Sequence, residues 1–283
     1  MRVIVTGAGG MVGRAVVAYC TEQGDEVLAF DRERLDIADA SAVKRTFDEE
    51  RPETVINCAA WTDVDGCQRD PARAHEANAL GPENLAVAAR LAGASLVTIS
   101  TDYVFDGTKQ GFYTQRDDPR PESVYGIAKL EGERRAQAAS ARTIVVRTGW
   151  IFGVGGRNFL SRIGELARTG ARLKAIHDAY GTPTFALDLA ARLRRLSEFD
   201  LPGVYHVVNS GEGASFSEFA RAALALGGGD ASAIEEVSMD ALERPAPRPR
   251  NSRLRCLLSE AVGLPPLPDW QQSLARFVAM TTP

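Results

Sequence analysis

The first half of the chain alternates between short apolar runs, rich in β-branched residues, and longer stretches in which apolar residues recur every three or four positions. The short runs predict buried strands, at residues 2–5, 26–31, 54–58, 95–101 and 143–147. The longer stretches predict amphipathic helices, at residues 12–22, 40–50, 71–92 and 123–139. Strands that alternate with helices of this length predict an α/β fold, with a doubly wound parallel sheet and right-handed crossovers.

The second half of the chain is less regular. It predicts four helices and one strand, with the helices at residues 158–168, 185–197, 217–226 and 270–280 and the strand at residues 204–208. A chain of 283 residues is long enough for one large domain or two modest ones. We expect residues 1–150 to hold the sheet, with a segment near 182–208 returning to it. We expect residues 151–283 to form mainly a smaller, mixed α/β domain.

Residues 243–250 read Glu-Arg-Pro-Ala-Pro-Arg-Pro-Arg. They cannot form a helix interior, because Pro245, Pro247 and Pro249 recur at every second position. Such a segment is compatible with a polyproline ligand or a basic patch. Because it lies inside a domain rather than at a chain end, we expect an ordered loop over a site.

Composition narrows the class of protein. Apolar residues make up 45% and charged residues 25% of the chain, and 33 Lys and Arg stand against 37 Asp and Glu, for a net charge of -4. A nucleic-acid binder is normally basic, so we expect no nucleic-acid partner. No apolar run approaches the roughly 20 residues that cross a bilayer, and we expect no membrane partner and a cytoplasmic protein.

The cysteines and histidines are scattered along the chain. They lack the spacing of a metal site or of a compact disulfide framework. These residues are Cys20, Cys58, Cys67, Cys256, His75, His177 and His206. We interpret the cysteines as reduced, half-buried apolar residues rather than catalytic thiols, and the histidines as structural or surface groups rather than metal ligands.

A glycine-rich turn follows the first predicted strand, where Gly7, Gly10 and Gly13 lead into the first helix. Glycine suits a backbone that must turn tightly, approach a pyrophosphate and let helix and strand pack closely, and the helix N-terminus offers N–H groups to phosphates. Asp31 ends the second strand 18 residues after Gly13, close to the spacing at which a carboxylate meets the adenosine ribose. This context favours a dinucleotide cofactor over a plain flexible turn, and a Rossmann-type NAD(P)-binding domain over residues 1–150.

The choice between NADH and NADPH depends on two neighbouring residues. Asp31 would accept hydrogen bonds from a free ribose 2′-hydroxyl and repel a 2′-phosphate, which favours NADH. Arg32 could pair with that phosphate, which favours NADPH, or remain a solvated side chain. We expect either NADPH or NADH, with NADPH slightly favoured.

Candidate catalytic residues follow the fourth strand. Thr101 ends that strand, at the edge where open α/β sheets bind ligands. Tyr125 and Lys129 lie one turn apart on one face of the next helix. A ketone reduction needs a hydride at carbon and a proton at oxygen, and a phenol with an ordinary pKa of about 10 serves near neutrality only if its anion is stabilised, for example by an ammonium group. Thr101 could donate a hydrogen bond to the developing alkoxide.

These motifs resemble those of the extended short-chain dehydrogenase/reductase family, and within it the dTDP-4-dehydrorhamnose reductases. The resemblance covers essentially the whole chain, and its C-terminal motifs are far more specific than the glycines. The matching stretches are Ser-Thr-Asp-Tyr-Val-Phe at 100–105, Tyr-Gly-Ile-Ala-Lys at 125–129, Arg-Thr-Gly-Trp at 147–150, Gly-Thr-Pro-Thr at 181–184, Arg-Pro-Arg-Asn-Ser-Arg-Leu at 248–254 and Leu-Pro-Asp-Trp at 267–270.

The resemblance implies NAD(P)H-dependent reduction of the 4-keto group of a dTDP-4-keto-6-deoxy-L-sugar, giving dTDP-L-rhamnose or a close relative. It implies catalytic roles for Thr101, Tyr125 and Lys129. The residues that we expect at the cofactor are Gly7, Gly10, Met11, Val12, Gly13, Asp31, Arg32, Asp36, Ile37, Asn57, Ala59, Ala60, Asn78, Tyr125 and Lys129. Those that we expect at the substrate are Thr62, Val64, Tyr103, Trp150, Asn158, Arg248 and Arg253. We expect residues 151–283 to form mainly a substrate-binding domain.

Two of these side-chain types have an obvious use. Trp150 offers a flat aromatic face to a sugar or thymine ring, or else packs in the core. Arg248 and Arg253 lie in or just after the proline-rich stretch and could bind diphosphate oxygens bidentately. The alternative for Arg253 is an ion pair that holds the loop in place.

The chain departs from the family at a metal site. Some bacterial members form a dimer around Mg²⁺ held by glutamates, one of them in the first helix. The corresponding residue here is Ala15, and Phe-Ala-Leu-Asp follows the Gly-Thr-Pro-Thr motif without a matching glutamate. Because Mg²⁺ demands oxygen ligands, we expect no metal, and a monomer or a weak homodimer.

Two other classes of function compete with this interpretation. Sugar-nucleotide dehydratases resemble one another in an Asp-Glu pair after the threonine, but here Tyr103 follows Asp102, which disfavours a dehydratase strongly and an epimerase moderately. A catalytically silent nucleotide-binding subunit is compatible with the fold. The intact set of Thr101, Tyr125 and Lys129 argues against it.

Overall fold

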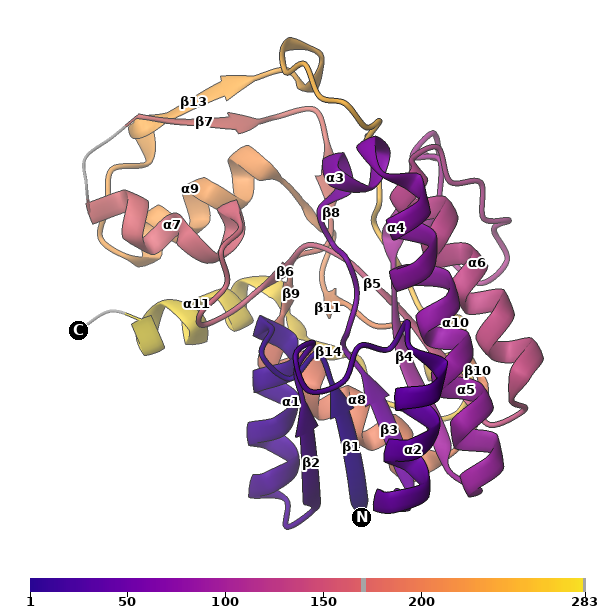
Figure 1. Cartoon of the computed structure of the whole chain (residues 1–283). Coiled ribbons are helices and arrows are strands. Elements are labelled where there is room, and N and C mark those ends of the chain that lie inside the picture. Colours follow the sequence, from indigo (N-terminus) through magenta and orange to yellow (C-terminus); the bar gives the residue numbers. More distant parts are fainter. Residues whose placement is uncertain (169–171, 282–283) are drawn as a thin grey trace.

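The structure is a computed structural model, and it describes residues 1–168 and 172–281. A six-stranded parallel sheet lies at its centre (Figure 1). Its strands, in spatial order, are β10 (Gly203–His206), β5 (Thr143–Thr148), β4 (Ser95–Thr101), β3 (Thr54–Asn57), β1 (Arg2–Thr6) and β2 (Glu26–Phe30). The chain reverses its direction of travel across the sheet between β1 and β3, which is where open sheets of this kind bind ligands.

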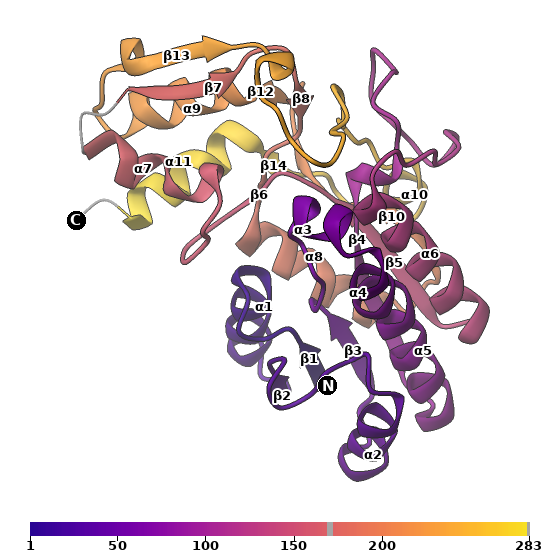
Figure 2. The ribbon, with the colours of Figure 1, turned by 45° about the horizontal axis from the view of Figure 1, so that its top comes forward.

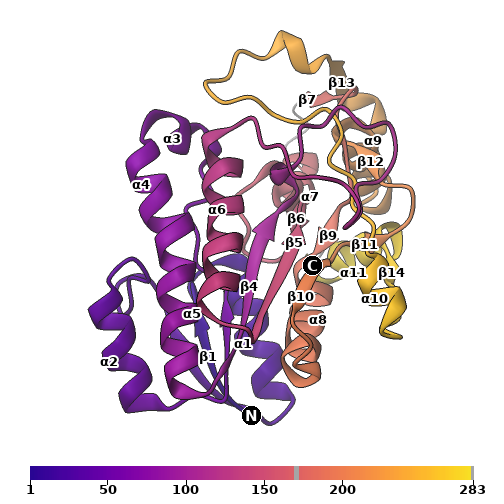
Figure 3. The same cartoon turned by 90° about the vertical axis from the view of Figure 1, so that its right-hand side faces the viewer.

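Helices cover both faces of the sheet (Figure 3). On one face, α1 (Met11–Glu22) packs against α8 (Ala186–Phe199) over a core that includes Val16 and Leu189. The helices of the other face are α2 (Ala40–Glu50), α5 (Gly81–Ala92) and α6 (Val124–Ala139). The predicted α/β fold with a doubly wound parallel sheet is thus confirmed.

The single helix predicted at residues 71–92 is in fact three pieces. They are α4 (Pro71–His75), the π-helical turn η1 (Glu76–Leu80) and α5. Pro82 lies in the first turn of α5, has no N–H to donate and would press its ring on the carbonyl one turn earlier in a regular α-helix. The wider π turn accommodates it. The short helix α3 (Val64–Arg69) was not predicted.

The C-terminal half builds a second layer above the sheet (Figure 2). Its aromatic core brings Phe152, Phe185, Phe219 and Phe277 together. The helices around this core are α7 (Phe159–Arg168), α9 (Phe216–Leu226) and α11 (Trp270–Thr281). The short strands are β6 (Ile151–Phe152), β7 (Leu173–Ile176), β8 (Tyr180–Gly181), β9 (Thr184–Phe185), β11 (Asn209–Ser210), β12 (Ala214–Ser215), β13 (Ile234–Val237) and β14 (Leu267–Asp269). The remaining pieces are α10 (Leu257–Ala261) and the 3₁₀ turns η2 (Asp102–Val104), η3 (Ala231–Ala233) and η4 (Met239–Ala241).

Two connections between the layers bear on the site. After leaving for the second layer, the chain returns through α8 and β10, and β10 pairs in parallel with β5. The proline-rich residues 243–250 contain no helix and reach α3, where the Ala246 N–H and the Arg248 guanidinium both donate to Asp65.

The division into domains near residue 150 stays a prediction. Within the described residues, no helix is long and apolar enough to cross a membrane.

Candidate active site

Two adjoining cavities open at the carboxyl edge of the sheet. The first, of about 470 Å³, lies beside the β1 and β2 ends, and the second, of about 500 Å³, lies beside the β4 and β5 ends. Four residues line both cavities: Gly10, Cys58, Ala59 and Ala60. The two cavities therefore form one cleft, long enough for an extended ligand that reacts at one end.

The glycine turn forms one wall of the first cavity. Gly7 has a φ of 66°, and a Cβ on it would lie 2.6 Å from the backbone nitrogen of Ala59. Only glycine fits this close approach between the β1–α1 turn and the segment after β3. Gly10 begins α1 as its N-cap without a side-chain cap, so the first N–H groups of a 12-residue helix are free to meet a phosphate. The turn thus fits the pyrophosphate of a dinucleotide.

The acidic end of β2 lines the same cavity. Asp31, Arg32, Asp36 and Ile37 all contribute to its wall. One oxygen of Asp31 accepts the Arg34 N–H at 3.0 Å, and Arg32 lies 3.5 Å from Asp36 in an exposed pair. An exposed pair of this kind is weak, so Arg32 can be drawn to another anion at little cost. The arrangement accommodates the adenosine ribose of either nicotinamide cofactor.

Asn57 and Asn78 are buried and do not line either cavity. Asn57 accepts from Thr6 at 2.7 Å and from the Ala59 N–H at 3.0 Å, which joins the ends of β1 and β3. Asn78 exchanges two hydrogen bonds with the backbone of Trp61. Both amides hold the segment at residues 58–61 that forms the cavity wall. A direct contact with the cofactor stays a prediction.

The three predicted catalytic residues lie together on one wall of the second cavity. Thr101 ends β4, and Tyr125 and Lys129 project from α6. The Ser123 hydroxyl accepts the Gly126 N–H at 3.1 Å and so fixes the start of α6. A Cβ at Gly126 would come within 2.3 Å of the Tyr103 carbonyl, so glycine lets the helix approach η2 closely. This packing brings the helix to the strand end.

Burial shifts the pKa values of both α6 side chains, the Tyr125 phenol and the Lys129 ammonium group. It raises the pKa of Tyr125 well above its ordinary value, while the nearby Thr101 hydroxyl acts in the opposite direction. Burial also lowers the pKa of Lys129 to about 8, partly offset by the Glu133 carboxylate. The Lys129 ammonium donates to the Ile99 carbonyl at 2.7 Å, which holds it under the cavity. Its charge is therefore present at neutral pH and available to stabilise a phenolate.

The pKa of Lys129 predicts how turnover depends on pH. The ammonium is charged below about pH 8 and loses its proton above it, so the expected stabilisation of a Tyr125 phenolate would be lost as pH rises. We expect kcat to fall as the pH is raised through about 8 to 9. A Lys129→Ala variant should show low turnover without this decline. A wild-type profile that stays level to about pH 9.5 would contradict this role for the ammonium.

Asp102 is a site residue to which the sequence analysis gave no role. It is 3% exposed and lines the second cavity beside Thr101. The Thr101 hydroxyl donates to one of its oxygens at 3.0 Å, and the other oxygen is buried with no hydrogen-bond partner. Burial raises the pKa of Asp102 to about 6, with Ser252 and Thr101 acting in the opposite direction. The single proton of Thr101 thus points at a carboxyl group whose ionised form is disfavoured by burial.

The substrate side of the second cavity carries most of the predicted contacts. Its walls include Thr62, Val64, Tyr103, Trp150 and Asn158. The Trp150 ring stacks on Phe216 with 3.8 Å between ring centroids, and its indole N–H donates to Ser252 at 3.2 Å. Trp150 also has a φ of 51°, which is strained for a bulky residue. An aromatic side chain that is held by stacking and by a hydrogen bond, on a strained backbone at a cavity wall, is typical of a ligand contact.

Arg248 and Arg253 lie elsewhere. Both line a third cavity, of about 530 Å³, which shares no lining residue with the first two. Arg248 lies close enough to the Tyr103 phenol to help lower its pKa, although burial raises that pKa to about 12 overall. Arg253 donates to Asn251 at 2.9 Å and to the carbonyl of Gln110 at 3.1 Å. The third cavity therefore borders the second through Tyr103.

Several residues of the second cavity were not assigned to the site from the sequence. They are Cys58, Ile99, Ser100, Asp102, Thr148, Gly149, Ile151, Phe159, Leu160 and Phe216. Four of them fall inside motifs that match the family, next to residues that were predicted to lie at the site. They are Ser100, Asp102, Thr148 and Gly149. Phe216 belongs to α9, and nothing local in its sequence places it against Trp150.

Comparison with known proteins identifies the family. The profile described as the RmlD substrate binding domain matches residues 1–282. The chain belongs to this family. A dTDP-4-dehydrorhamnose reductase of Streptomyces griseus is 39% identical over 281 residues, which cover 97% of this chain and 92% of that protein. A probable dTDP-4,6-dihydroxy-2-methyloxan-3-one 4-ketoreductase of Streptomyces antibioticus is 36% identical over 276 residues, covering 97% of this chain and 93% of that protein.

A solved relative agrees in structure over the full length. The dTDP-4-dehydrorhamnose reductase of Bacillus anthracis, solved in complex with NADP, is 34% identical, has a TM-score of 0.95 and is matched over 99% of each chain. The resemblance inferred from the motifs is thus confirmed. So is the prediction of an NAD(P)H-dependent oxidoreductase with a Rossmann-type fold.

The structure places the two residues of this RmlD family member on which the metal prediction rests, Ala15 and Asp188. Ala15 is buried in the α1–α8 interface. Asp188, the carboxylate of Phe-Ala-Leu-Asp, accepts from Asn209, Ser273 and Arg276. Among the described residues, no group of three or more His, Cys, Asp or Glu side chains could hold a metal ion.

Because Ala15 offers no carboxylate, we expect removal of divalent metal to leave the enzyme unchanged. EDTA should not alter turnover, and added Mg²⁺ should not alter the mass in solution, because Mg²⁺ needs several oxygen ligands. The measurements are steady-state rates and light scattering with and without the metal. A Mg²⁺-dependent rise in mass would contradict the prediction.

Proposed function

We propose that this chain uses NADPH or NADH to reduce the 4-keto group of a dTDP-4-keto-6-deoxy-L-sugar, dTDP-4-dehydrorhamnose, to dTDP-L-rhamnose. One observation carries the proposal. Thr101, Tyr125 and Lys129 meet on one wall of a cavity that continues into the cavity of the glycine turn. Such a cleft can hold a nicotinamide cofactor along the glycines and a ketone against the phenol.

The reduced nicotinamide, when bound, supplies the hydride that forms the new C–H bond at C4. Tyr125 donates its phenolic proton to the carbonyl oxygen, so that the C=O π bond becomes C–H and O–H bonds. Lys129 stabilises the phenolate that remains, through the charge of its ammonium group. A proton from solvent then restores the phenol.

Thr101 stabilises the oxygen on which negative charge develops. Its hydroxyl accepts the Tyr103 N–H at 3.1 Å and points its own proton at Asp102. When Asp102 is protonated, the carboxylic acid can donate to Thr101, which frees the Thr101 proton for the substrate oxygen. The raised pKa of Asp102, about 6, makes this neutral form accessible.

Turnover of the sugar nucleotide tests the function directly. Purified protein with dTDP-4-dehydrorhamnose and NADPH or NADH should oxidise one cofactor for each dTDP-L-rhamnose formed, measured by absorbance and by chromatography of the product. A catalytically silent subunit would bind cofactor without oxidising it. Release of a 4-epimer without net cofactor oxidation would identify an epimerase instead.

A second candidate is reduction of a different dTDP-4-keto-deoxysugar. The relative from Streptomyces antibioticus, named as a probable 4-ketoreductase, is nearly as similar as the relative from Streptomyces griseus. The catalytic residues serve either reaction, because both reduce a ketone. The ratio of kcat/KM for the two classes of dTDP-sugar decides between them.

We also propose that Arg253 shapes the binding of the sugar nucleotide through the third cavity. Arg253→Ala should raise KM for the sugar nucleotide at least several-fold while leaving kcat and KM for the cofactor nearly unchanged, as expected when uniform binding is lost. Steady-state kinetics with each substrate varied in turn measure this. If both KM values are normal and the variant instead melts several degrees lower, the arginine only pins the loop that holds Gln110.

A further inference from the structure

A separate cavity of about 190 Å³ lies where the sheet edge meets the C-terminal segments. Its walls come from α8, from the end of β10 and from residues 207–211, 254–260 and 264–267. Its lining residues are absent from the three cavities described above. We refer to it as the junction cavity. Its charged lining residues are Arg192, Arg255 and Glu260, together with the titratable His206 and Cys256.

Arg192 is the unusual member of this wall. It projects from α8 and is 8% exposed, yet its guanidinium makes one hydrogen bond within the described residues, to the carbonyl of Pro265. The carboxylate one turn earlier, Asp188, is occupied by Arg276 and two other donors. Glu260 lines the same cavity but forms no ion pair with Arg192 among the described residues. Burial without a counter-ion lowers the pKa of Arg192.

An unpaired buried charge of this kind calls for a partner. A largely buried guanidinium with one protein acceptor leaves its remaining N–H groups to ordered water or to an anion that enters the cavity. Arg192 lines the cavity, and none of its nitrogens is among the fully enclosed side-chain atoms without a hydrogen-bond partner. The cavity is several times the roughly 30 Å³ that one water molecule occupies.

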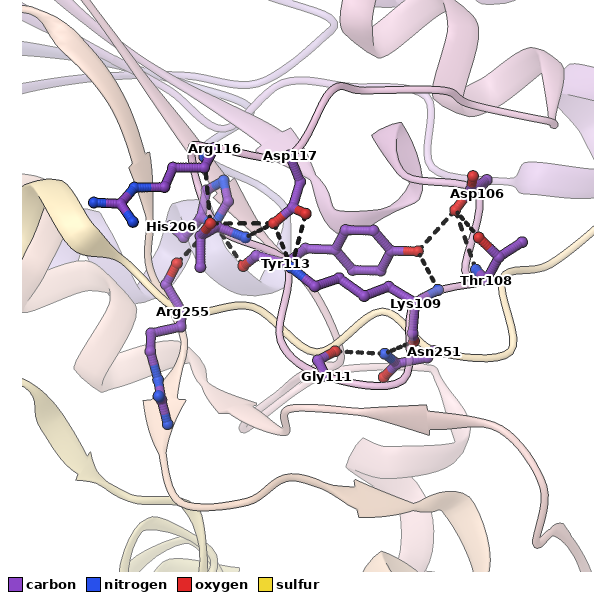
Figure 4. A network of polar contacts seen from close by, with 11 residues as sticks. Asp106, Thr108, Lys109, Gly111, Tyr113, Arg116, Asp117, His206, Asn251 and Arg255 are labelled. Carbon is purple, nitrogen blue, oxygen red and sulfur yellow. Dashed lines mark hydrogen bonds and ion pairs between the residues drawn. The ribbon is translucent and has the colours of Figure 1, made fainter.

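The rest of the wall is held in place by its own hydrogen bonds. Figure 4 shows the ring of His206 beside the carbonyls of Tyr113 and Arg255, which lie 3.2 and 3.0 Å from Nδ1. Burial and the nearby Arg147 lower the pKa of His206 to about 4, so the ring is neutral at pH 7. The Cys256 sulfur accepts hydrogen bonds from the backbone N–H of His206 and from the side chains of Gln115 and Ser259. The site is thus preformed, with its positive charge on the two arginines.

Arg255 supplies the second charge. Its guanidinium is exposed, lies 4.6 Å above the Phe112 ring and forms no ion pair within the described part of the chain. Arg192 and Arg255 together outnumber the one carboxylate of the cavity, Glu260. The cavity therefore carries an excess of positive charge although the whole chain has a net charge of -4.

We propose that the junction cavity binds a small oxyanion of the size and charge of inorganic phosphate, with the Arg192 guanidinium as its principal donor and Arg255 as a second cation. Arginine suits this role because its planar fork offers two parallel N–H groups to two oxygens of one anion. The bound anion joins α8 to the segment around Pro265 and so stabilises the contact between the sheet edge and the C-terminal part. The site is independent of the reductase reaction, since it shares no residue with the cleft.

Binding of phosphate by the full-length protein tests the proposal. Titration calorimetry and thermal melts compare phosphate, sulfate, acetate and chloride at equal ionic strength. In the wild type we expect phosphate and sulfate at roughly 10 mM to raise Tm by a few degrees, as binding to the native state alone requires, and acetate and chloride to have a smaller effect. Arg192→Met keeps the aliphatic stem and removes the charge, so it should weaken phosphate binding at least about tenfold.

A matched control separates this site from general charge effects. Arg45→Met removes one exposed arginine of α2, far from the cavity in the chain, and should bind phosphate like the wild type. If Arg192→Met does not fold, Arg255→Met makes the same comparison from an exposed position, with a loss of at least about threefold expected. Equal phosphate binding by wild type and the cavity variants, or no phosphate binding by the wild type, would overturn the proposal.

Discussion

Replacement of Tyr125 by phenylalanine is expected to lower kcat by at least about 10²-fold, the effect typical of losing a general acid. The ring stays, so its edge-to-face contact with Tyr103, with centroids 6.1 Å apart, should be kept. Only the proton donor at the cavity wall is lost. The measurement is single-turnover oxidation of the reduced cofactor with the sugar nucleotide in excess.

The control for this variant is its cofactor affinity. Because the substitution keeps the ring and removes only the phenolic hydroxyl, Tyr125→Phe should bind NADPH and melt nearly as the wild type does. Lys129→Ala should lose turnover as well and bind cofactor more weakly. Near wild-type turnover in Tyr125→Phe would show that another group protonates the alkoxide.

The second large effect is expected on stability. Glu133 and Arg147 form a buried ion pair at 2.7 Å, with side-chain exposures of 3% and 7%, and Ser100 donates to the same carboxylate at 2.5 Å. Glu133→Ala leaves the Arg147 charge buried and unpaired, which typically costs about 3–5 kcal/mol. We therefore expect Tm to fall by roughly 10 °C in a chain of this size.

A double replacement provides the matched comparison. Glu133→Leu with Arg147→Met removes both charges and fills their space, and buried pairs replaced in this way are often no less stable. Urea unfolding of the single and double variants measures the difference. If Glu133→Ala loses less than about 1 kcal/mol, water must replace the lost carboxylate at the α6–β5 contact.

The sheet and the grouping of Thr101, Tyr125 and Lys129 could be predicted because both depend on patterns of residues close together in the sequence. Alternating apolar runs located β1 to β5, and the i, i+4 spacing placed Tyr125 and Lys129 on one face of α6. Gly81-Pro82 indicates a break in the helix. The π turn η1 was nevertheless not predicted, because the helical periodicity continues on both sides of it.

The parts that could not be predicted depend on contacts between segments far apart in the chain. Phe216 reaches Trp150 only after α9 has packed in the second layer. The role of Asp102 depends on its burial and on the unpartnered oxygen, neither of which a motif reveals. The missing counter-ion of Arg192 is likewise visible only once the carboxylate at Asp188 is seen to be occupied.

The return of the chain to the sheet through α8 and β10 has a consequence for synthesis on the ribosome. Until residue 206 has been made, β5 is an open edge, and the apolar face of α1 has no α8 to cover it. An uncovered strand edge is a template for unwanted pairing with other chains. A nascent chain halted at residue 150 should therefore need a chaperone. Exchange of the second layer between relatives should succeed only when the crossover points lie outside residues 186–206.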